Sequence, residues 1–164
     1  MMGVGKSTIG KKLAKKLRLK FIDVDKIIEK KEKNTIRNIF EKKGEYYFRK
    51  IEKKITLQQI KKEESLIALG GGAFLNASIR KEIKNCCISF WLDLDLKSLT
   101  SRLRIAKKRP LLDKDKLEES VYRIYSERKK FYNESNFKIK CNSMDKDEII
   151  YKIKELYENS DNQV

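Results

Sequence analysis

Several residue types that often carry chemistry are scarce or missing in this chain of 164 residues. It has no His, and its three Cys, at Cys86, Cys87 and Cys141, do not have the spacing of metal ligands. A zinc site is therefore not expected. Three cysteines without a signal peptide fit a reducing compartment, so we expect a cytoplasmic protein. No apolar run approaches the ~18 residues of a membrane span, and no membrane partner is expected.

Acidic residues are in the minority, with 24 Asp and Glu against 40 Lys and Arg and a formal net charge of +16. One interpretation is a surface that binds nucleic acid or a membrane. The other is a composition in which Lys fills every solvent-facing position. The spread of Lys along all the predicted helices favours the second, and no aromatic residues interleave with the Lys as a stacking platform needs. We therefore expect no nucleic-acid partner, although the positive field attracts an anionic nucleotide.

Glycine occurs only seven times and proline once, and all of them lie in short motifs. Glycine is costly in regular structure and useful where the backbone must approach a ligand. These segments are therefore the first candidates for a functional site. The residues are Gly3, Gly5, Gly10, Gly44, the triplet Gly70–Gly72 and Pro110.

The hydrophobic pattern predicts strands that alternate with helices. Short apolar runs predict strands at 20–22, 66–69, 88–92 and 137–141. Amphipathic periodicity predicts helices over 7–17, 26–31, 36–44, 45–62, 76–84, 96–103, 117–132 and 146–157. Such an alternation implies a parallel sheet covered by helices on both faces, and the length suits one domain over residues 1–164.

The chain opens with Gly3-Val4-Gly5-Lys6-Ser7-Thr8, the end of a G-x-x-x-x-G-K-[ST] phosphate-binding loop. We expect backbone N–H groups to face phosphates, Lys6 to neutralise the β- and γ-phosphates, and Ser7 to bind Mg²⁺. The alternative is a chance Gly/Lys turn. The motif's first Gly would fall before Met1, and no strand precedes the loop. We therefore expect the functional protein to start upstream of this sequence.

Asp23-Val24-Asp25 follows the first predicted strand, where alternation would point both carboxylates the same way. The strand before Gly70 ends without an acid, so Asp23 is the natural second Mg²⁺ ligand. Asp25 then faces the acceptor, where it positions a hydroxyl group or takes its proton. The alternative for Asp25 is an N-cap of the helix that follows.

Arg49 and Glu52 lie three residues apart on a predicted helix, so the carboxylate can orient the guanidinium as a clamp for a ligand's carboxylate. The alternative is a surface salt bridge. Gly70–Gly72 follows a buried strand and would let a ligand touch the backbone at the sheet's carboxyl end, unless it is only a flexible turn.

Three further Arg, at Arg102, Arg109 and Arg128, lie in or near a charged loop over about 105–116. A mobile lid that carries an Arg excludes water and stabilises a transferring phosphoryl group. The alternative, which is favoured for any one of them taken alone, is a solvated charge.

Together these segments resemble the shikimate kinase family, in the same order from Met1 to about Asn142. The resemblance rests on G-x-G-K-S-T, F-I-D-V-D, G-E-x-x-F-R-x-x-E, L-G-G-G-A, R-P-L-L and Arg128-x-x-x-Tyr132. The related adenylate and gluconate kinases lack the G-E-x-x-F-R-x-x-E and G-G-G pair. The resemblance implies transfer of the γ-phosphoryl group of ATP to the 3-hydroxyl of shikimate, in aromatic amino-acid biosynthesis, with Mg²⁺ as cofactor. We expect a monomer.

The resemblance also implies roles by position, with the substrate region at about 25–60 and the lid at about 105–116. Lys6, Asp25 and Arg109 are the implied catalytic residues, and Ser7 and Asp23 the implied metal ligands. The implied ATP-binding residues are Gly3, Val4, Gly5, Lys6, Ser7, Thr8, Arg102, Arg109 and Asn142. The implied shikimate-binding residues are Asp25, Arg49, Gly70, Gly71, Gly72 and Arg128, with Phe40, Phe48 and Leu111 as walls.

The implied fold is a three-layer α/β P-loop kinase with a five-stranded parallel sheet in the order 2-3-1-4-5. The family's first strand is central in that order and is missing from this chain. Its loss would leave two strand edges that face a gap. Two alternatives remain open: a kinase for another carboxylate-bearing small molecule, and a nucleotide-binding remnant with impaired catalysis.

Overall fold

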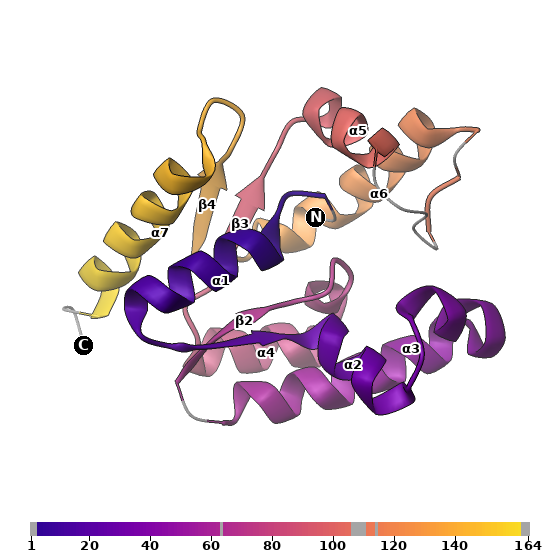
Figure 1. The fold of residues 1–164 in the computed structure, drawn as a ribbon, viewed down its shortest axis with the longest axis horizontal. Coiled ribbons are helices and arrows are strands. Elements are labelled where there is room, and N and C mark those ends of the chain that lie inside the picture. The colour runs from indigo at the N-terminus through magenta and orange to yellow at the C-terminus, as the bar shows by residue number, and fades with distance from the viewer. Residues whose placement is uncertain (1–2, 63, 106–110, 114, 162–164) are drawn as a thin grey trace.

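The computed structural model describes residues 3–62, 64–105, 111–113 and 115–161, in which helices and strands alternate (Figure 1). The predicted elements are present, with ends that differ from the prediction by a few residues. The elements are α1 (Lys6–Leu17), β1 (Lys20–Asp23), α2 (Val24–Glu32), α3 (Ile36–Ile60), β2 (Ser65–Ala68), the 3₁₀ turn η1 (Ala73–Leu75), α4 (Ala77–Cys86), β3 (Phe90–Asp93), α5 (Leu96–Ile105), α6 (Leu117–Tyr132), β4 (Phe137–Lys140) and α7 (Lys146–Asp161).

Helix starts follow the capping residues in the sequence. Thr35 Oγ1 accepts a hydrogen bond from the Asn38 N–H at 3.2 Å, and Asp95 Oδ1 accepts one from the Ser98 N–H at 2.8 Å. Such caps satisfy N–H groups that have no partner inside the helix. Gly44, with φ 77° and ψ 170°, interrupts α3, so the predicted boundary between two helices is confirmed as a kink.

The strands form two separate parallel pairs. β1 pairs with β2, from Lys20 opposite Ser65 to Asp23 opposite Ala68. β3 pairs with β4 in the same sense, and no ladder joins β2 to β3 within the described ranges. Figure 1 shows α1 lying across the middle of the molecule, between the two pairs.

An apolar cavity of about 270 Å³ lies between the two strand pairs. Its walls come from α1, β2 and β3, and they include Leu13, Leu66 and Trp91. Among the described residues, each of β2 and β3 has a strand partner on one side only. The prediction that two strand edges face a gap is therefore confirmed.

Two apolar clusters hold these layers together. The larger one joins α1 with α4 to α7 and the strands β3 and β4. The smaller one lies under α2 and α3 and centres on Val24, Ile28, Ile39, Phe48 and Ile55. This second cluster fixes the α2–α3 unit against the carboxyl end of β2, where the candidate site lies.

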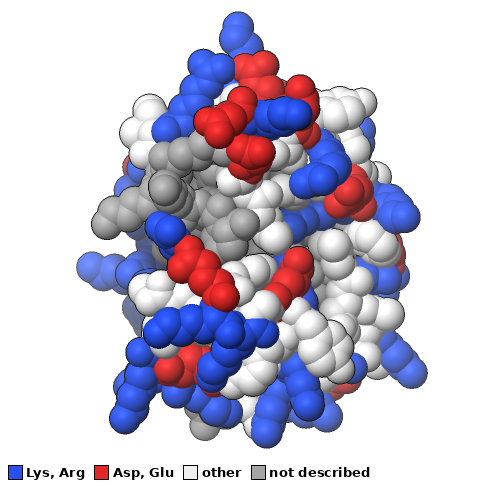
Figure 2. Space-filling model, turned by 90° about the vertical axis from the view of Figure 1, so that its right-hand side faces the viewer, with Lys and Arg blue, Asp and Glu red and all other residues white. Residues whose placement is uncertain are grey.

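Lys and Arg are distributed over the face shown in Figure 2, with acidic and uncharged side chains between them. Among the described helices, none is both long and apolar enough to cross a membrane.

Candidate active site

The phosphate-binding loop has the backbone that its glycines predict. Gly3 and Gly5 have φ values of 77° and 87°, a left-handed conformation that side chains disfavour. α1 starts directly afterwards at Lys6, and Gly5 has no side chain to cap it. The first N–H groups of the helix and its dipole are therefore directed at the loop, an arrangement that suits phosphate. Val4 is 2% exposed and anchors the loop in the core.

Ser7 and Asp23 meet although 16 residues separate them. The Ser7 hydroxyl donates to Asp23 Oδ2 at 2.7 Å, and Asp23 also caps α2 by accepting from the Lys26 N–H. A hydroxyl and a carboxylate side by side are hard oxygen ligands, which Mg²⁺ combines with phosphate oxygens and water. No group of three His, Cys, Asp or Glu in the described part of the chain could hold a metal by itself. The pair therefore fits a Mg²⁺ ion that is held partly by a nucleotide.

Asp25 does not lie on the strand. α2 begins at Val24, so Asp25 is in its first turn, and the prediction that strand alternation aligns it with Asp23 was wrong. The alternative considered for Asp25, the N-cap of the following helix, is the role of Asp23, which caps α2. The Asp25 carboxylate instead lies beside Gly70: a Cβ atom at that glycine would be 2.8 Å from Asp25 Oδ1 and 2.5 Å from Glu52 Oε1. Glycine at position 70 thus lets β2 end directly against these two carboxylates.

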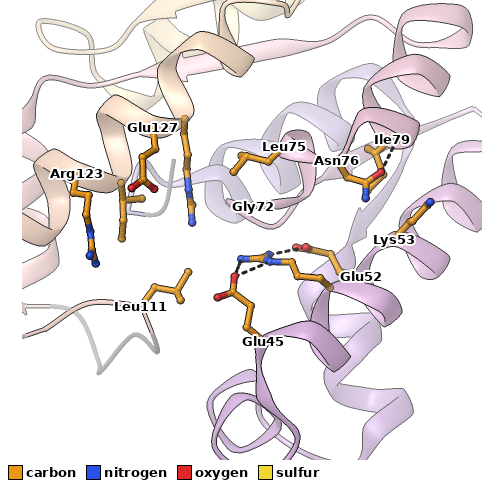
Figure 3. Close-up of a pocket in the computed structure, with 13 residues that line it drawn as sticks. Glu45, Glu52, Lys53, Gly72, Leu75, Asn76, Ile79, Leu111, Arg123 and Glu127 are labelled. Carbon is orange, nitrogen blue, oxygen red and sulfur yellow. Dashed lines mark hydrogen bonds and ion pairs between the residues drawn. The ribbon is translucent and has the colours of Figure 1, made fainter.

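The Arg49 guanidinium is held by two carboxylates (Figure 3). Its Nη1 donates to Glu52 Oε2 at 2.6 Å, while Nε and Nη2 donate to Glu45 Oε1 at 3.0 and 2.9 Å. Its Cζ atom lies 5.1 Å from the ring centre of Phe48 and 5.9 Å from that of Phe40. The aromatic pair thus borders the guanidinium, as a wall of an acceptor site would.

Glu52 is a buried acid, with only 2% of its surface exposed. Burial raises the pKa of its carboxyl group, and the neighbouring Arg49 charge acts in the opposite direction. Its Oε1 atom has no hydrogen-bond partner among the described residues. A buried hydrogen-bond acceptor without a partner destabilises the fold, and such groups are typical of functional sites.

Arg128 and Tyr132 both donate to the carbonyl oxygen of Gly71, and the Arg128 Nη1 bond measures 2.8 Å. They lie four residues apart on one face of α6, and Arg128 is only 5% exposed. Sequence reasoning assigned no role to Tyr132, although the four-residue spacing indicated a shared face.

Arg49, Arg128 and Gly72 all line a cavity of about 510 Å³. It also contains side chains that sequence reasoning did not single out, such as Lys53, Asn76, Arg123 and Glu127, because nothing local marks them (Figure 3). Leu111 lines the same cavity, and it is one of the three described residues between 106 and 114.

The residues predicted for the nucleotide's base lie at the ends of α5 and β4. The Asn142 side-chain oxygen accepts from the Asp95 N–H at 2.8 Å and joins the two elements. Arg102 is exposed on α5. It lies close enough to Cys141 to lower the pKa of that thiol, although burial dominates and raises it to about 11. Arg109 and Pro110 lie outside the described residues.

Comparison with known proteins is consistent across sequence and structure. The family model described as shikimate kinase matches residues 2–158. A shikimate kinase of Sulfurihydrogenibium sp. (strain YO3AOP1) is 41% identical over 152 residues, which cover 93% of this chain and 90% of the relative. That of Bacillus subtilis (strain 168) is 38% identical, with 90% of this chain and 80% of the relative covered.

Solved structures agree. The shikimate kinase from Acinetobacter baumannii in complex with shikimate superposes with a TM-score of 0.91 at 31% identity, covering 97% of this chain and 89% of that one. The shikimate kinase from Aquifex aeolicus superposes with a TM-score of 0.82 at 31% identity, covering 98% of this chain and 93% of that one. The sequence match and the fold lead to one conclusion: the chain belongs to the shikimate kinase family.

Proposed function

We propose that this chain transfers the γ-phosphoryl group of ATP to the 3-hydroxyl of shikimate. The observation that carries the proposal is the arrangement around β2. Asp25 lies beside Gly70 and Arg49 beside Gly72, and Arg128 donates a hydrogen bond to the Gly71 carbonyl oxygen. The Ser7–Asp23 pair marks the phosphate end of the site.

On the nucleotide side, the N–H groups of Gly3, Val4, Gly5, Lys6 and Ser7 would hold the phosphates, and Thr8 would extend this contact. The Lys6 ammonium would neutralise charge on the transferring group. By family resemblance, Arg109 acts from the lid at 105–116, and Arg102 and Asn142 border the adenine. Ser7 and Asp23 would hold Mg²⁺, which supplies positive charge against the β- and γ-oxygens when it is bound.

On the acceptor side, Arg49 and Arg128 would bind the carboxylate, since guanidinium groups form paired hydrogen bonds with carboxylates. Asp25 would orient the reacting hydroxyl. Phe40, Phe48 and Leu111 would wall the ring, and Gly70, Gly71 and Gly72 would let the ring approach the backbone. Region 25–60 would thus be the acceptor half of a single domain over residues 1–164.

In the transfer step, the acceptor oxygen forms a bond to the γ-phosphorus while the bond between that phosphorus and the β,γ-bridging oxygen breaks. ADP leaves with the electron pair, and the hydroxyl proton passes to Asp25 or to water. Because such transition states are largely dissociative, positioning by Asp25 can be enough without full proton abstraction. We also propose that the protein works as a monomer in the cytoplasm.

Release of ADP in the presence of ATP, Mg²⁺ and shikimate tests the proposal. The expected result is shikimate-dependent turnover that is lost in Lys6→Ala and retained in Arg104→Ala, which changes an exposed residue of α5. A folded protein that binds ATP but shows no shikimate-dependent turnover, even after a strand and a glycine are added ahead of Gly3, would refute the acceptor assignment. Other carboxylate-bearing alcohols would then be screened.

A further inference from the structure

The two carboxylates that hold Arg49 differ sharply in their surroundings. Glu52 is 2% exposed and is enclosed between Arg49 and the end of β2. The Glu45 side chain is 50% exposed. It directly follows Gly44, where the chain kinks, and has solvent beside it. One partner of the guanidinium is therefore fixed and the other is replaceable.

The Glu45 contact uses the guanidinium edge that a ligand's carboxylate would use. Glu45 offers one oxygen atom, Oε1, to both Nε and Nη2. A carboxylate that offers both oxygens would make two parallel hydrogen bonds on that edge, which is the stronger arrangement. Glu45 and Arg49 both line the 510 Å³ cavity, so a ligand in the cavity can reach the edge (Figure 3).

The charges around the site favour exchange over addition. Asp25, Glu45 and Glu52 surround the cations Arg49 and Arg128 at the end of β2. A further carboxylate, if Glu45 stayed, would place three carboxylates around one guanidinium. Like charges at such distances repel, and a partly buried site screens them less than water does.

We propose that Glu45 is an internal competitor for the acceptor's carboxylate. In the empty protein it occupies the Nε/Nη2 edge of Arg49 and keeps the guanidinium in place. When an acceptor binds, the acceptor's carboxylate takes this edge and Glu45 turns to solvent. Glu45 thereby sets the acceptor affinity and eases release of the phosphorylated product. The inference rests on the proposed function, because it takes the cavity as the acceptor site.

Glu45→Gln tests this inference, since the amide oxygen can still accept from Arg49 but carries no charge. Calorimetric titration without nucleotide would compare shikimate with its methyl ester, which lacks the carboxylate. Glu45→Gln should lower the Kd for shikimate about two- to fivefold, the range expected for an exposed ion pair, and leave that for the ester unchanged. Glu41→Gln is the matched control, because Glu41 forms an i,i+4 pair with Arg37 on the same helix outside the cavity.

If the role of Glu45 were only to orient Arg49, Glu45→Gln would raise the Kd for shikimate instead of lowering it. An unchanged or raised Kd for shikimate in a stably folded Glu45→Gln protein would overturn the inference, as would an equal gain for the ester. In steady state the KM should fall while kcat does not rise.

If wild type neither binds nor phosphorylates shikimate, the proposed function fails, and a second probe still tests Glu45. Cyclohexanecarboxylate would be titrated while the ¹⁵Nε signal of Arg49 is followed, assigned by its loss in Arg49→Lys. Tighter binding in Glu45→Gln than in wild type supports the competitor, and equal or weaker binding refutes it.

Discussion

Replacing Gly72 by Ala should damage acceptor binding without much effect on stability. The backbone at Gly72 has φ −106° and ψ −13°, a conformation that Ala adopts without strain. The added Cβ, however, would lie 2.6 Å from both Cζ and Nη2 of Arg49. Because real contacts are longer by about an ångström, the guanidinium must move away from Gly72, giving up part of its bonding with the exposed Glu45 while it stays paired with the buried Glu52.

The magnitude follows from what Arg49 would do for the ligand. A hydrogen bond to a charged group contributes about 1.5–3 kcal/mol, so a displaced guanidinium should raise the KM for shikimate about 10- to 100-fold. Stability should change by less than about 1 kcal/mol, since the atoms met are the far end of a partly exposed side chain.

Steady-state kinetics and thermal melts would be measured together, with Gly10→Ala for comparison. At Gly10 a Cβ would lie 2.6 Å from Phe21 Cε2 and 3.2 Å from Leu66 Cδ2, in the apolar core. That variant should lose about 1–3 kcal/mol by overpacking and keep its KM. The reasoning fails if Gly72→Ala retains the wild-type KM, or if its stability falls as far as that of Gly10→Ala.

Three other changes have defined outcomes. Glu52→Gln should flatten the pH dependence of stability. Burial raises the pKa of the Glu52 carboxyl group above its ordinary 4.5, so the native state keeps this proton to a higher pH than the unfolded state does. The free energy of unfolding of the wild type should therefore fall as the pH rises from 4.5 through the raised pKa. Melts from pH 4 to 8 test this, and parallel curves for both proteins would contradict it. Ser7→Ala should raise the Mg²⁺ concentration needed for half-maximal ADP release several-fold, because it removes a hydroxyl ligand beside Asp23. In the structure this hydroxyl donates to Asp23 at 2.7 Å. An unchanged Mg²⁺ requirement would count against a metal-binding role for it. Fusing an extended apolar strand ahead of Gly3 should fill the 270 Å³ cavity and pair with β2 and β3, stabilising the protein by several kcal/mol. A strand of the same length with two prolines is the control, and equal melting temperatures for the two fusions would refute the pairing.

The structure departs from the sequence predictions at the end of β1. Asp25 was placed by strand alternation, but the helix starts one residue after Asp23, whose side chain caps it. The carboxylates of Asp23 and Asp25 consequently face different partners: Ser7 in one case, the Gly70 backbone and Glu52 in the other. The residue pattern predicted which helices and strands form. The exact end of a four-residue strand is the kind of boundary that a local pattern predicts least well.

Some features of this protein are written in short stretches of sequence. The start of α1, the helix boundary at Gly44 and the Arg49–Glu52 pair all depend on residues within one or two helical turns. Backbone sterics and i,i+3 neighbours decide such features, so the sequence alone was enough to predict them.

Other features were decided only by tertiary packing. The meeting of Ser7 with Asp23, the convergence of Arg128 and Tyr132 on Gly71 over 57 and 61 residues, and the burial of Glu52 all depend on contacts between elements that are distant in the sequence. The same packing leaves Glu45 half exposed while Glu52 is enclosed, although both bind one guanidinium. No periodicity encodes that difference, because exposure depends on which distant elements cover a side chain.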